Sequence, residues 1–274
     1  MTLVRPLRAV CGVLASAAAL ACPLSSASAA DGASITQLSG SSDAVAVLDQ
    51  SGAFKATATI SQDGSSPTAV IVQSGSGAAD TAEIDQSGGK GQGAYVEQQG
   101  AGDGALVVQS QAGGGTSLDG GSLLPADFRA QLSASFDPSS HPSAVIAQLG
   151  DRDQATLRQQ AGADGSYAEI GQRGDHNVAV LTQSAASSFA SIYQSGDGDQ
   201  ASITQTGTGL TGSITQTGDL NDATLTQTGE ALYYRIVQDG VSTQASSGSS
   251  SIGFVGATSI RVEQTDAAVH ITLH

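Results

Sequence analysis

Glutamine recurs at nearly every eleventh position through the second half of this chain, with a single longer step. The glutamines of this series are Gln148, Gln159, Gln172, Gln183, Gln194, Gln205, Gln216, Gln227 and Gln238. Each closes a similar short phrase, such as Ala201-Ser-Ile-Thr-Gln205. A unit this short cannot bury an apolar face alone, so the series predicts units that stack into an elongated fold.

The composition argues against an ordinary globular core. The chain has 35 Gly, one Met and no Trp, and only 4% of its residues are aromatic. The large side chains that usually fill a protein interior are therefore scarce. Burial must come from many small contacts of Ala, Val, Ile and Leu, repeated along an axis.

Residues 1–30 have the pattern of a secretory signal peptide. Arg5 and Arg8 precede an apolar stretch over residues 9–21, and small residues follow up to Ala29 and Ala30. Cleavage is expected after Ala29 or Ala30. The chain is thus predicted to be secreted.

Both cysteines, Cys11 and Cys22, lie inside this leader. The mature chain would then have no cysteine and no disulfide, although its destination is oxidising. The residues before Cys22 also faintly match a lipoprotein cleavage site. This alternative stays open, although the small-residue site downstream fits better.

The charge of the mature chain excludes most nucleic-acid binding. Removal of residues 1–30 leaves 8 Lys and Arg against 25 Asp and Glu, a net charge near −17. Binding to phosphate needs a basic face, so nucleic acid is not an expected partner. No later segment approaches the roughly 18 apolar residues of a transmembrane helix, so no membrane span is expected.

The repeats fall into two blocks, since an earlier and looser series of glutamines precedes the regular one at spacings of eleven to thirteen positions. Its members are Gln37, Gln50, Gln62, Gln73, Gln86, Gln98 and Gln109. The expected organisation is a first block at 31–111, a Gly/Pro-rich linker or loop at 112–142 with a helical turn near 126–132, a second block at 143–240, a Ser/Gly-rich loop at 241–258, and a terminal strand unit or cap at 259–274.

Within each phrase the residues alternate with a period of two, which indicates a β-strand. Ala201, Ile203 and Gln205 fall on one face of the strand, and the Ser and Thr residues between them fall on the other. Polar turns with glycine separate the strands, because glycine accepts positive φ and Asn or Asp can bond nearby backbone. The turn residues singled out are Gly174, Asn177, Gly196, Gly218 and Asn221.

Two such units make one flat rung of about 22 residues, and rungs stack at about 4.8 Å. The prediction is an all-β parallel β-solenoid with two short strands per rung and two facing parallel sheets. Every second unit then shares a sheet, which separates the ladder Gln172, Gln194, Gln216 and Gln238 from the ladder Gln183, Gln205 and Gln227. A buried unpaired amide costs about 1–3 kcal/mol, and stacked amides satisfy each other. The alternative is that the glutamines face solvent.

Two phrases of the second block resemble the curlin repeat, Q-x-G-x-x-N-x-A-x-x-x-Q. They run from Gln172 to Gln183 and from Gln216 to Gln227. Two further phrases match with Asp153 and Asp199 in place of the asparagine. The resemblance implies a bacterial β-solenoid subunit that is secreted through an outer-membrane channel. It also implies that a nucleating curlin-like subunit starts polymerisation, in which copies of the chain join into extracellular functional amyloid on the bacterial cell surface. Such fibres are the curli, which serve adhesion and the biofilm matrix.

Two departures leave the type of subunit open. Typical curlin subunits are shorter than this chain, whose repeats imply about eight rungs, counted from sixteen glutamine-closed half-units. The serine that leads the curlin consensus is mostly absent here. A major fibre subunit, a minor nucleating subunit and a monomeric secreted solenoid of the adhesin or matrix type therefore remain alternatives.

Assembly would use the unpaired strand edges at the two ends of the solenoid. No cap is evident at the first strand, near residues 34–37, and the last unit, near 269–273, is either a cap or a donor edge. Head-to-tail addition would then continue the ladders without a new kind of contact.

A row of acidic turn residues is expected to slow this assembly by repulsion between carboxylates one rung apart, worth about 1 kcal/mol per pair in water. These residues are Asp151, Asp175, Asp197 and Asp219. Acid, a divalent cation, or Asp→Asn at two of these positions should then speed assembly. The alternative is that these residues form turns and keep the chain soluble.

No catalytic, cofactor-binding or metal-binding residue is assigned, and no enzyme activity or cofactor is expected. The four histidines, His141, His176, His270 and His274, are scattered, and no common catalytic motif surrounds them. A calcium-binding β-roll is disfavoured because its nine-residue period differs from the eleven seen here. An ice-binding face is disfavoured because paired outward threonines, such as Thr204 and Thr206, would alternate between the two sheets.

Overall fold

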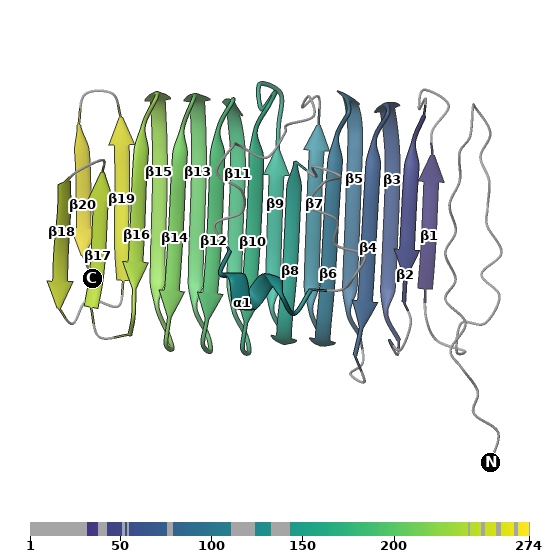
Figure 1. Ribbon diagram of the computed structural model, residues 1–274, viewed down its shortest axis with the longest axis horizontal. Coiled ribbons are helices and arrows are strands. Elements are labelled where there is room, and N and C mark those ends of the chain that lie inside the picture. Colours follow the sequence, from purple (N-terminus) through teal and green to yellow (C-terminus); the bar gives the residue numbers. More distant parts are fainter. Residues whose placement is uncertain are drawn as a thin grey trace, which may run out of the picture.

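The computed structural model describes residues 32–37, 43–50, 53, 55–75, 79–110, 124–132, 143–240, 242–247, 250–255, 259–265 and 268–273. Within these ranges the chain forms two long β-sheets that face each other (Figure 1). We call them sheet 1 and sheet 2. In both of them the strands lie side by side along one axis, so the molecule is elongated.

Sheet 1 contains the odd-numbered strands except β17 and, at its end, β20. Its order is β1 (Gly32–Gln37), β3 (Thr57–Ser65), β5 (Thr81–Lys90), β7 (Gly104–Ser110), β9 (Gln154–Gln159), β11 (Val178–Ala186), β13 (Gln200–Thr208), β15 (Asp222–Glu230), β19 (Ser259–Thr265) and β20 (Val269–Leu273). Neighbours from β1 to β19 pair in parallel, as stacked rungs require.

Sheet 2 contains the even-numbered strands except β20, together with β17. Its order is β2 (Val45–Asp49), β4 (Thr68–Ser74), β6 (Gly93–Ala101), β8 (Ala144–Asp151), β10 (Tyr167–Arg173), β12 (Phe189–Ser195), β14 (Thr211–Thr217), β16 (Tyr233–Gln238), β17 (Ser242–Ser247) and β18 (Ser250–Val255). Neighbours from β2 to β16 pair in parallel. The predicted all-β parallel solenoid of two sheets is confirmed.

The register places like residues on like residues. In β10 and β12, for example, Ala168 pairs with Ala190 and Ile170 with Ile192. Stacked glutamines lie 22 residues apart from Gln172 to Gln238, as predicted, and 23 to 25 apart in the looser first block. The extra residues of the first block are therefore absorbed without loss of register at the glutamines.

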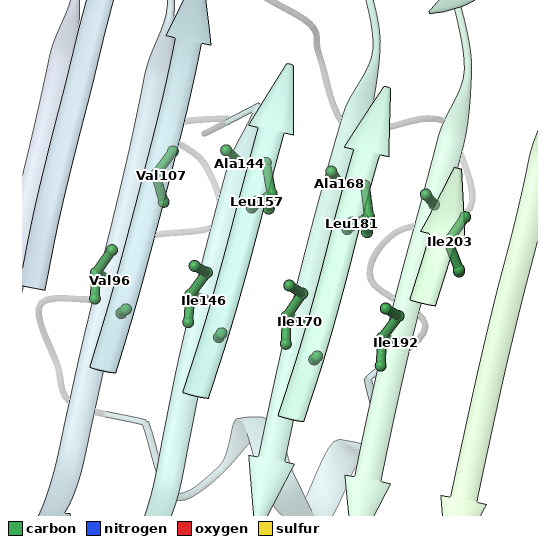
Figure 2. Close-up of a cluster of buried hydrophobic side chains, with 14 of the residues drawn as sticks. Val96, Val107, Ala144, Ile146, Leu157, Ala168, Ile170, Leu181, Ile192 and Ile203 are labelled. Atoms are coloured by element: carbon green, nitrogen blue, oxygen red, sulfur yellow. The ribbon is translucent and has the colours of Figure 1, made fainter. Parts of the chain in front are cut away.

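The core is a thin double row of small and branched side chains between the sheets. Figure 2 shows Ile146, Ile170 and Ile192 in one row, with Leu157 and Leu181 beside them from the facing sheet. All five are fully buried. Burial of one such side chain stabilises a fold by about 1.5–3 kcal/mol, so the solenoid accumulates its stability rung by rung.

The two repeat blocks form one continuous solenoid. Strand β6 pairs directly with β8, and β7 pairs with β9, although the whole stretch 111–143 lies between β7 and β8 in the chain. Within this insert the structure describes residues 124–132, which include the short helix α1 (Ala126–Arg129). The helical turn expected near 126–132 is confirmed, and α1 lies across the middle of sheet 2 (Figure 1).

The C-terminal end departs from the parallel pattern. Strand β17 pairs antiparallel with β16, β18 antiparallel with β17, and β20 antiparallel with β19. The expectation of a loop at 241–258 is wrong, because two strands lie there. The last unit, at 269–273, reverses its direction instead of beginning another parallel rung.

Candidate functional site

Two ladders of glutamine amides run along the core, one in each sheet. In sheet 2 the ladder joins Gln50, Gln73, Gln98, Gln148, Gln172, Gln194, Gln216 and Gln238. In sheet 1 it joins Gln62, Gln86, Gln109, Gln159, Gln183, Gln205, Gln227 and Gln264. Each Nε2 donates to the Oε1 of the next rung at 2.7–3.0 Å. The predicted separation into two ladders is confirmed, and these side chains are buried apart from Gln50, which is half-buried.

Each amide also holds the two sheets together. Gln205 Nε2 donates a second hydrogen bond to the carbonyl oxygen of Phe189, 3.0 Å away in the facing sheet. Gln216 Nε2 does the same to Gln200, at 2.8 Å. One N–H thus follows the solenoid axis and the other crosses the core, so both donors are satisfied. Leucine at these positions would leave a carbonyl on one sheet and an amide on the next rung without partners.

The ladders have a direction, because each rung donates toward the C-terminus. At the N-terminal end, Gln50 donates to Gln73, and among the described residues no donor reaches Gln50 Oε1. The backbone of Gln37 pairs with Gln62, and its side chain lies outside the described ranges. Within the described residues, Gln50 beside strand β2 is thus the first member of the sheet 2 ladder, and its Oε1 lies at the acceptor end of that ladder.

A second buried column runs through the turns that lead into sheet 1, and we call it the turn column. Its members are Asp80, Asp103, Asp153, Asn177, Asp199 and Asn221, all buried. The Oδ1 of each member except the last, Asn221, accepts the backbone N–H of the next member, at 2.8–3.2 Å. This bond supplies an acceptor for a turn N–H that no strand ladder could reach.

Asparagine and aspartate differ in the second atom that they place in this column. The Nδ2 of Asn177 donates to the carbonyl oxygen of Gly196, and that of Asn221 to Gly218. The corresponding Oδ2 atoms of Asp103, Asp153 and Asp199 are buried and have no hydrogen-bond partner. A carboxyl group can donate a hydrogen bond from this atom only when it is protonated.

The pKa values of these carboxyl groups are raised, as expected for buried carboxyl groups whose Oδ2 atoms have no hydrogen-bond donor. Burial raises the pKa of Asp103 to about 7 and that of Asp153 to about 8, and it also raises the pKa values of Asp80 and Asp199. The neighbouring carboxylates of Asp151 and Asp175 add to the rise at Asp103. Asp153, and in part Asp103, therefore keep their protons near neutral pH, where a solvent-exposed aspartate is ionised.

The predicted turn glycines stack on one another. Gly174, Gly196 and Gly218 have φ values of +105°, +153° and +91°. A Cβ on Gly174 would lie 2.2 Å from the carbonyl oxygen of Gly196, and one on Gly196 would lie 2.1 Å from that of Gly218. Glycine is thus required here both for its conformation and for the close approach of successive turns.

The acidic residues singled out as a charge brake also stack in one row, on the exposed side of the same turns. The N–H of Asp151 donates to Asp175 Oδ1, that of Asp175 to Asp197, and that of Asp197 to Asp219, at 2.9–3.1 Å. These carboxylates therefore lie one rung apart, and those of Asp175, Asp197 and Asp219 each accept a hydrogen bond from a turn N–H. Their role as a brake on assembly stays a prediction.

Serines form a similar column in the turns that lead into sheet 2. The N–H of Ser188 donates to Ser166 Oγ at 3.0 Å, and the N–H of Leu210 donates to Ser188 Oγ at 2.9 Å. Both serines are buried and lie six residues before a ladder glutamine. Sequence reasoning missed their role, although their common spacing of six residues to Gln172 and Gln194 is visible in the sequence.

Comparison with known protein families matches the curlin associated repeat at residues 163–196 and 196–229. Two copies of the curlin associated repeat lie in this chain. The matched ranges contain both asparagines of the turn column, the stacked glycines, and the ladder glutamines from Gln172 to Gln227. Curlin repeats are structural, not enzymatic. Comparisons with curated proteins and with solved structures gave no significant match.

Two further findings concern the described part of the chain. No helix there is long and apolar enough to cross a membrane. In the same ranges, no three His, Cys, Asp or Glu side chains gather in a way that could hold a metal ion.

Proposed function

We propose that this protein is a secreted subunit that self-assembles into extracellular curli-type amyloid fibres for adhesion and for the biofilm matrix. The observation that carries the proposal is the pair of buried glutamine ladders. They pass through both repeat blocks and across the insert without a break, since Gln98 donates to Gln148 and Gln109 to Gln159. Stacked in-register amides between parallel strands are typical of amyloid.

The natural growth point is the N-terminal end, where β1 and β2 are the edge strands of the described part of the two sheets. Both belong to the parallel ladders, and Gln50 presents its acceptor there. Another copy that donates amide and backbone N–H groups to this edge would extend the existing pattern. The resemblance to curlin subunits adds a nucleating curlin-like subunit and an outer-membrane secretion channel as further proposed partners.

The C-terminal end supports a second candidate, a minor nucleating subunit. Here the sheets close with antiparallel strands, so an incoming copy would not meet a continuation of the parallel ladders. Head-to-tail addition at this end would therefore need a new kind of contact. A solenoid with one parallel edge and one antiparallel end is suited to templating growth in one direction.

The test is seeded assembly of purified residues 31–274, followed by amyloid-dye fluorescence. We expect seeds to abolish the lag, and Gln205→Leu to slow growth far more than the matched outward substitution Thr204→Leu. A lasting monomer would refute assembly and leave a monomeric solenoid of the adhesin type. If trace amounts accelerate another curlin subunit while the protein alone does not elongate, it is a nucleator.

A further inference from the structure

The turn column has two parts of different composition. Its first three members are all carboxyl groups on successive rungs, and we call Asp80, Asp103 and Asp153 the carboxyl run. The N–H of Asp103 donates to Asp80 Oδ1 at 3.2 Å, and that of Asp153 donates to Asp103 Oδ1 at 3.0 Å. Beyond the run, amides and a carboxyl group alternate. These later members are Asn177, Asp199 and Asn221.

The carboxyl run lies at the junction of the two repeat blocks. Its members directly precede β5, β7 and β9. The backbone of the run also joins these rungs, since the N–H of Thr81 donates to the carbonyl oxygen of Asp103 and that of Gly104 to Asp153, both at 2.8 Å. In the order of sheet 1, β1 and β3 reach the second block only through these three strands (Figure 1).

The second oxygen of these carboxyl groups faces the turn glycines. A Cβ on Gly100 would lie 2.9 Å from Asp103 Oδ2, and this buried oxygen has no hydrogen-bond partner. At the equivalent place, Asn221 Nδ2 donates at 3.1 Å to the carbonyl oxygen of Gly218, three residues before it. Gly100 is likewise three residues before Asp103. A protonated carboxyl group can donate in this way, whereas a carboxylate can only accept.

Like charges surround the run. Asp103 faces three other carboxyl groups, those of Asp80, Asp151 and Asp175. Asp153 faces those of Asp103 and Asp175, and Asp80 faces that of Asp151. Burial first, and these neighbours second, raise the pKa of Asp103 to about 7 and that of Asp153 to about 8, and they raise the pKa of Asp80. The run therefore disfavours ionisation for two independent reasons.

Two basic side chains lie on the outer side of the same turns. Arg152 and His176 are exposed and meet each other, with 3.3 Å between Arg152 Nη1 and His176 Nε2. Within the described ranges neither forms an ion pair. Water and salt screen exposed charges, so these two side chains compensate a buried carboxylate only weakly.

The rest of the column is better suited to hold a charge. Asp199 lies between two neutral amides, and its Oδ1 accepts both the backbone N–H of Asn221 at 2.8 Å and Asn221 Nδ2 at 3.0 Å. Hydrogen bonds to a carboxylate favour its charged form. Burial still raises the pKa of Asp199, and the carboxylates of Asp197 and Asp219 add to the rise. This part has one carboxyl group, whereas the run has three.

We propose that the carboxyl run is a pH-sensitive switch that keeps strands β1 to β9 folded in acid and lets them open near neutral pH, while the second block from β10 onward stays folded. Each rung of a solenoid contacts only its neighbours, so one end can unpair without the rest. Ionisation of the run weakens the rungs that attach this end.

The direction follows from proton binding. An opened aspartate titrates near its ordinary 3.8, while the folded run holds its protons to a higher pH. As the pH rises between these limits, each such carboxyl group shifts the equilibrium toward the open form by about tenfold per pH unit. The proposed fibre function enters only in the consequence, because β1 and β2 carry the proposed growth edge. Acid would then present that edge, and neutral pH would withdraw it.

Hydrogen exchange of the freshly purified monomer, residues 31–274, tests the switch without any fibre. Protection factors, corrected for intrinsic exchange, are compared at pH 5, 6, 7 and 8. Protection of β5 and β7 should fall at least about 100-fold from pH 5 to pH 7, because two pH units lie within the titration range of the run. Protection of β13 and β15 should change far less.

Asp103→Asn with Asp153→Asn should abolish most of this fall and raise the rate of seeded elongation at pH 7. Asp103→Asn alone should abolish part of it. The matched control is Asp197→Asn with Asp219→Asn, which makes the same chemical change twice in the exposed row and should keep the fall at β5 and β7.

The outcomes separate the switch from the proposed function. If β5 and β7 keep their protection relative to β13 and β15 at all four pH values, or if both Asp103 variants keep the full fall, the switch is refuted and the proposed function stands. If the fall occurs and the Asp103 variants reduce it, but no form of the chain elongates from seeds, the proposed function fails and the switch stands.

Discussion

Replacing Asp153 by Asn should stabilise the solenoid at neutral pH and leave its stability in acid almost unchanged. The Oδ1 of this residue accepts the N–H of Asn177 at 2.8 Å, and its buried Oδ2 has no partner. Asparagine keeps the acceptor and adds an amide donor, as Asn177 and Asn221 do in the same column. The substitution therefore removes an ionisable group without removing the contact that the turn needs.

The size of the effect follows from the pKa of Asp153. The carboxyl titrates at an ordinary 3.8 in the unfolded chain and at about 8 in the fold, because burial disfavours its charged form. Well below pH 4 it is protonated in both states, and its titration then takes nothing from the stability of the fold. As the pH rises toward 8, the unfolded state releases the proton first and stability falls. At pH 7 this difference amounts to about 4 kcal/mol, at about 1.4 kcal/mol for each tenfold change in proton affinity.

The assay is urea unfolding followed by far-ultraviolet circular dichroism at several pH values from 4 to 8. The wild type should lose stability steadily over that range, and Asp153→Asn should lose less. The matched control is Asp197→Asn, which makes the same chemical change in an exposed carboxylate of the neighbouring row and leaves the turn column intact. The reasoning is refuted if Asp153→Asn stabilises the chain equally at pH 4 and pH 8, or not at all.

Three other substitutions test separate parts of the structure. Gln205→Leu should lower the free energy of unfolding by about 1–3 kcal/mol for each buried group left unpaired, and Thr204→Val should change it little, as urea unfolding would show. Gly196→Ala should destabilise the turn strongly, because its Cβ would lie 2.1 Å from a carbonyl oxygen, and a drop in melting temperature would report this. Asp197→Asn combined with Asp219→Asn should shorten the lag of assembly at pH 7. An unchanged lag in dye fluorescence would refute the prediction that repulsion between these aspartates slows assembly.

Acid should speed assembly in part through the turn column, because protonation of its buried carboxyl groups stabilises each rung. Asp153→Asn removes part of this contribution and leaves the exposed row of aspartates unchanged. If the acceleration between pH 7 and pH 5 is the same in Asp153→Asn as in the wild type, the turn column has no part in it.

The sheets and ladders could be predicted because the glutamines carry two signals, their parity within a strand and their spacing between strands. Gln205 shares its parity with Ala201 and Ile203, which places it inside, and its spacing to Gln227 places it on the next rung of the same sheet. Both facts are visible in the sequence. The stacking of Gln98 on Gln148 is not, because the length of an insert does not say whether the rungs on either side of it meet.

The buried carboxyl groups show why spacing alone was insufficient. Asp151 and Asp153 are two residues apart in one turn, yet the first is exposed and the second is buried. The fold of the turn decides which of them points inward. The available signal was the curlin asparagine position, which Asp80 and Asp103 also occupy, each two residues ahead of the alanine that opens a strand.

Periodicity could not predict how helix α1 packs or that the C-terminal segments form strands. The segment at 241–258 has no repeat, and its Ser and Gly content favours a loop. Backbone pairing with the edge of β16 nevertheless makes it a strand, because an unpaired edge accepts almost any extended segment. The packing of Leu124 and Phe128 on Gly171 could not be predicted, because a glycine at an outward strand position does not indicate what packs on it.

The central claim is that the parallel ladders of one molecule extend into a fibre, and fibre diffraction tests it most directly. Purified residues 31–274, assembled and aligned, should give a meridional reflection at about 4.8 Å and an equatorial one at about 10 Å. Gln205→Leu should weaken the yield of such fibres much more than Thr204→Leu. A protein that stays monomeric at high concentration in the presence of seeds, or fibres without that meridional reflection, would contradict the account.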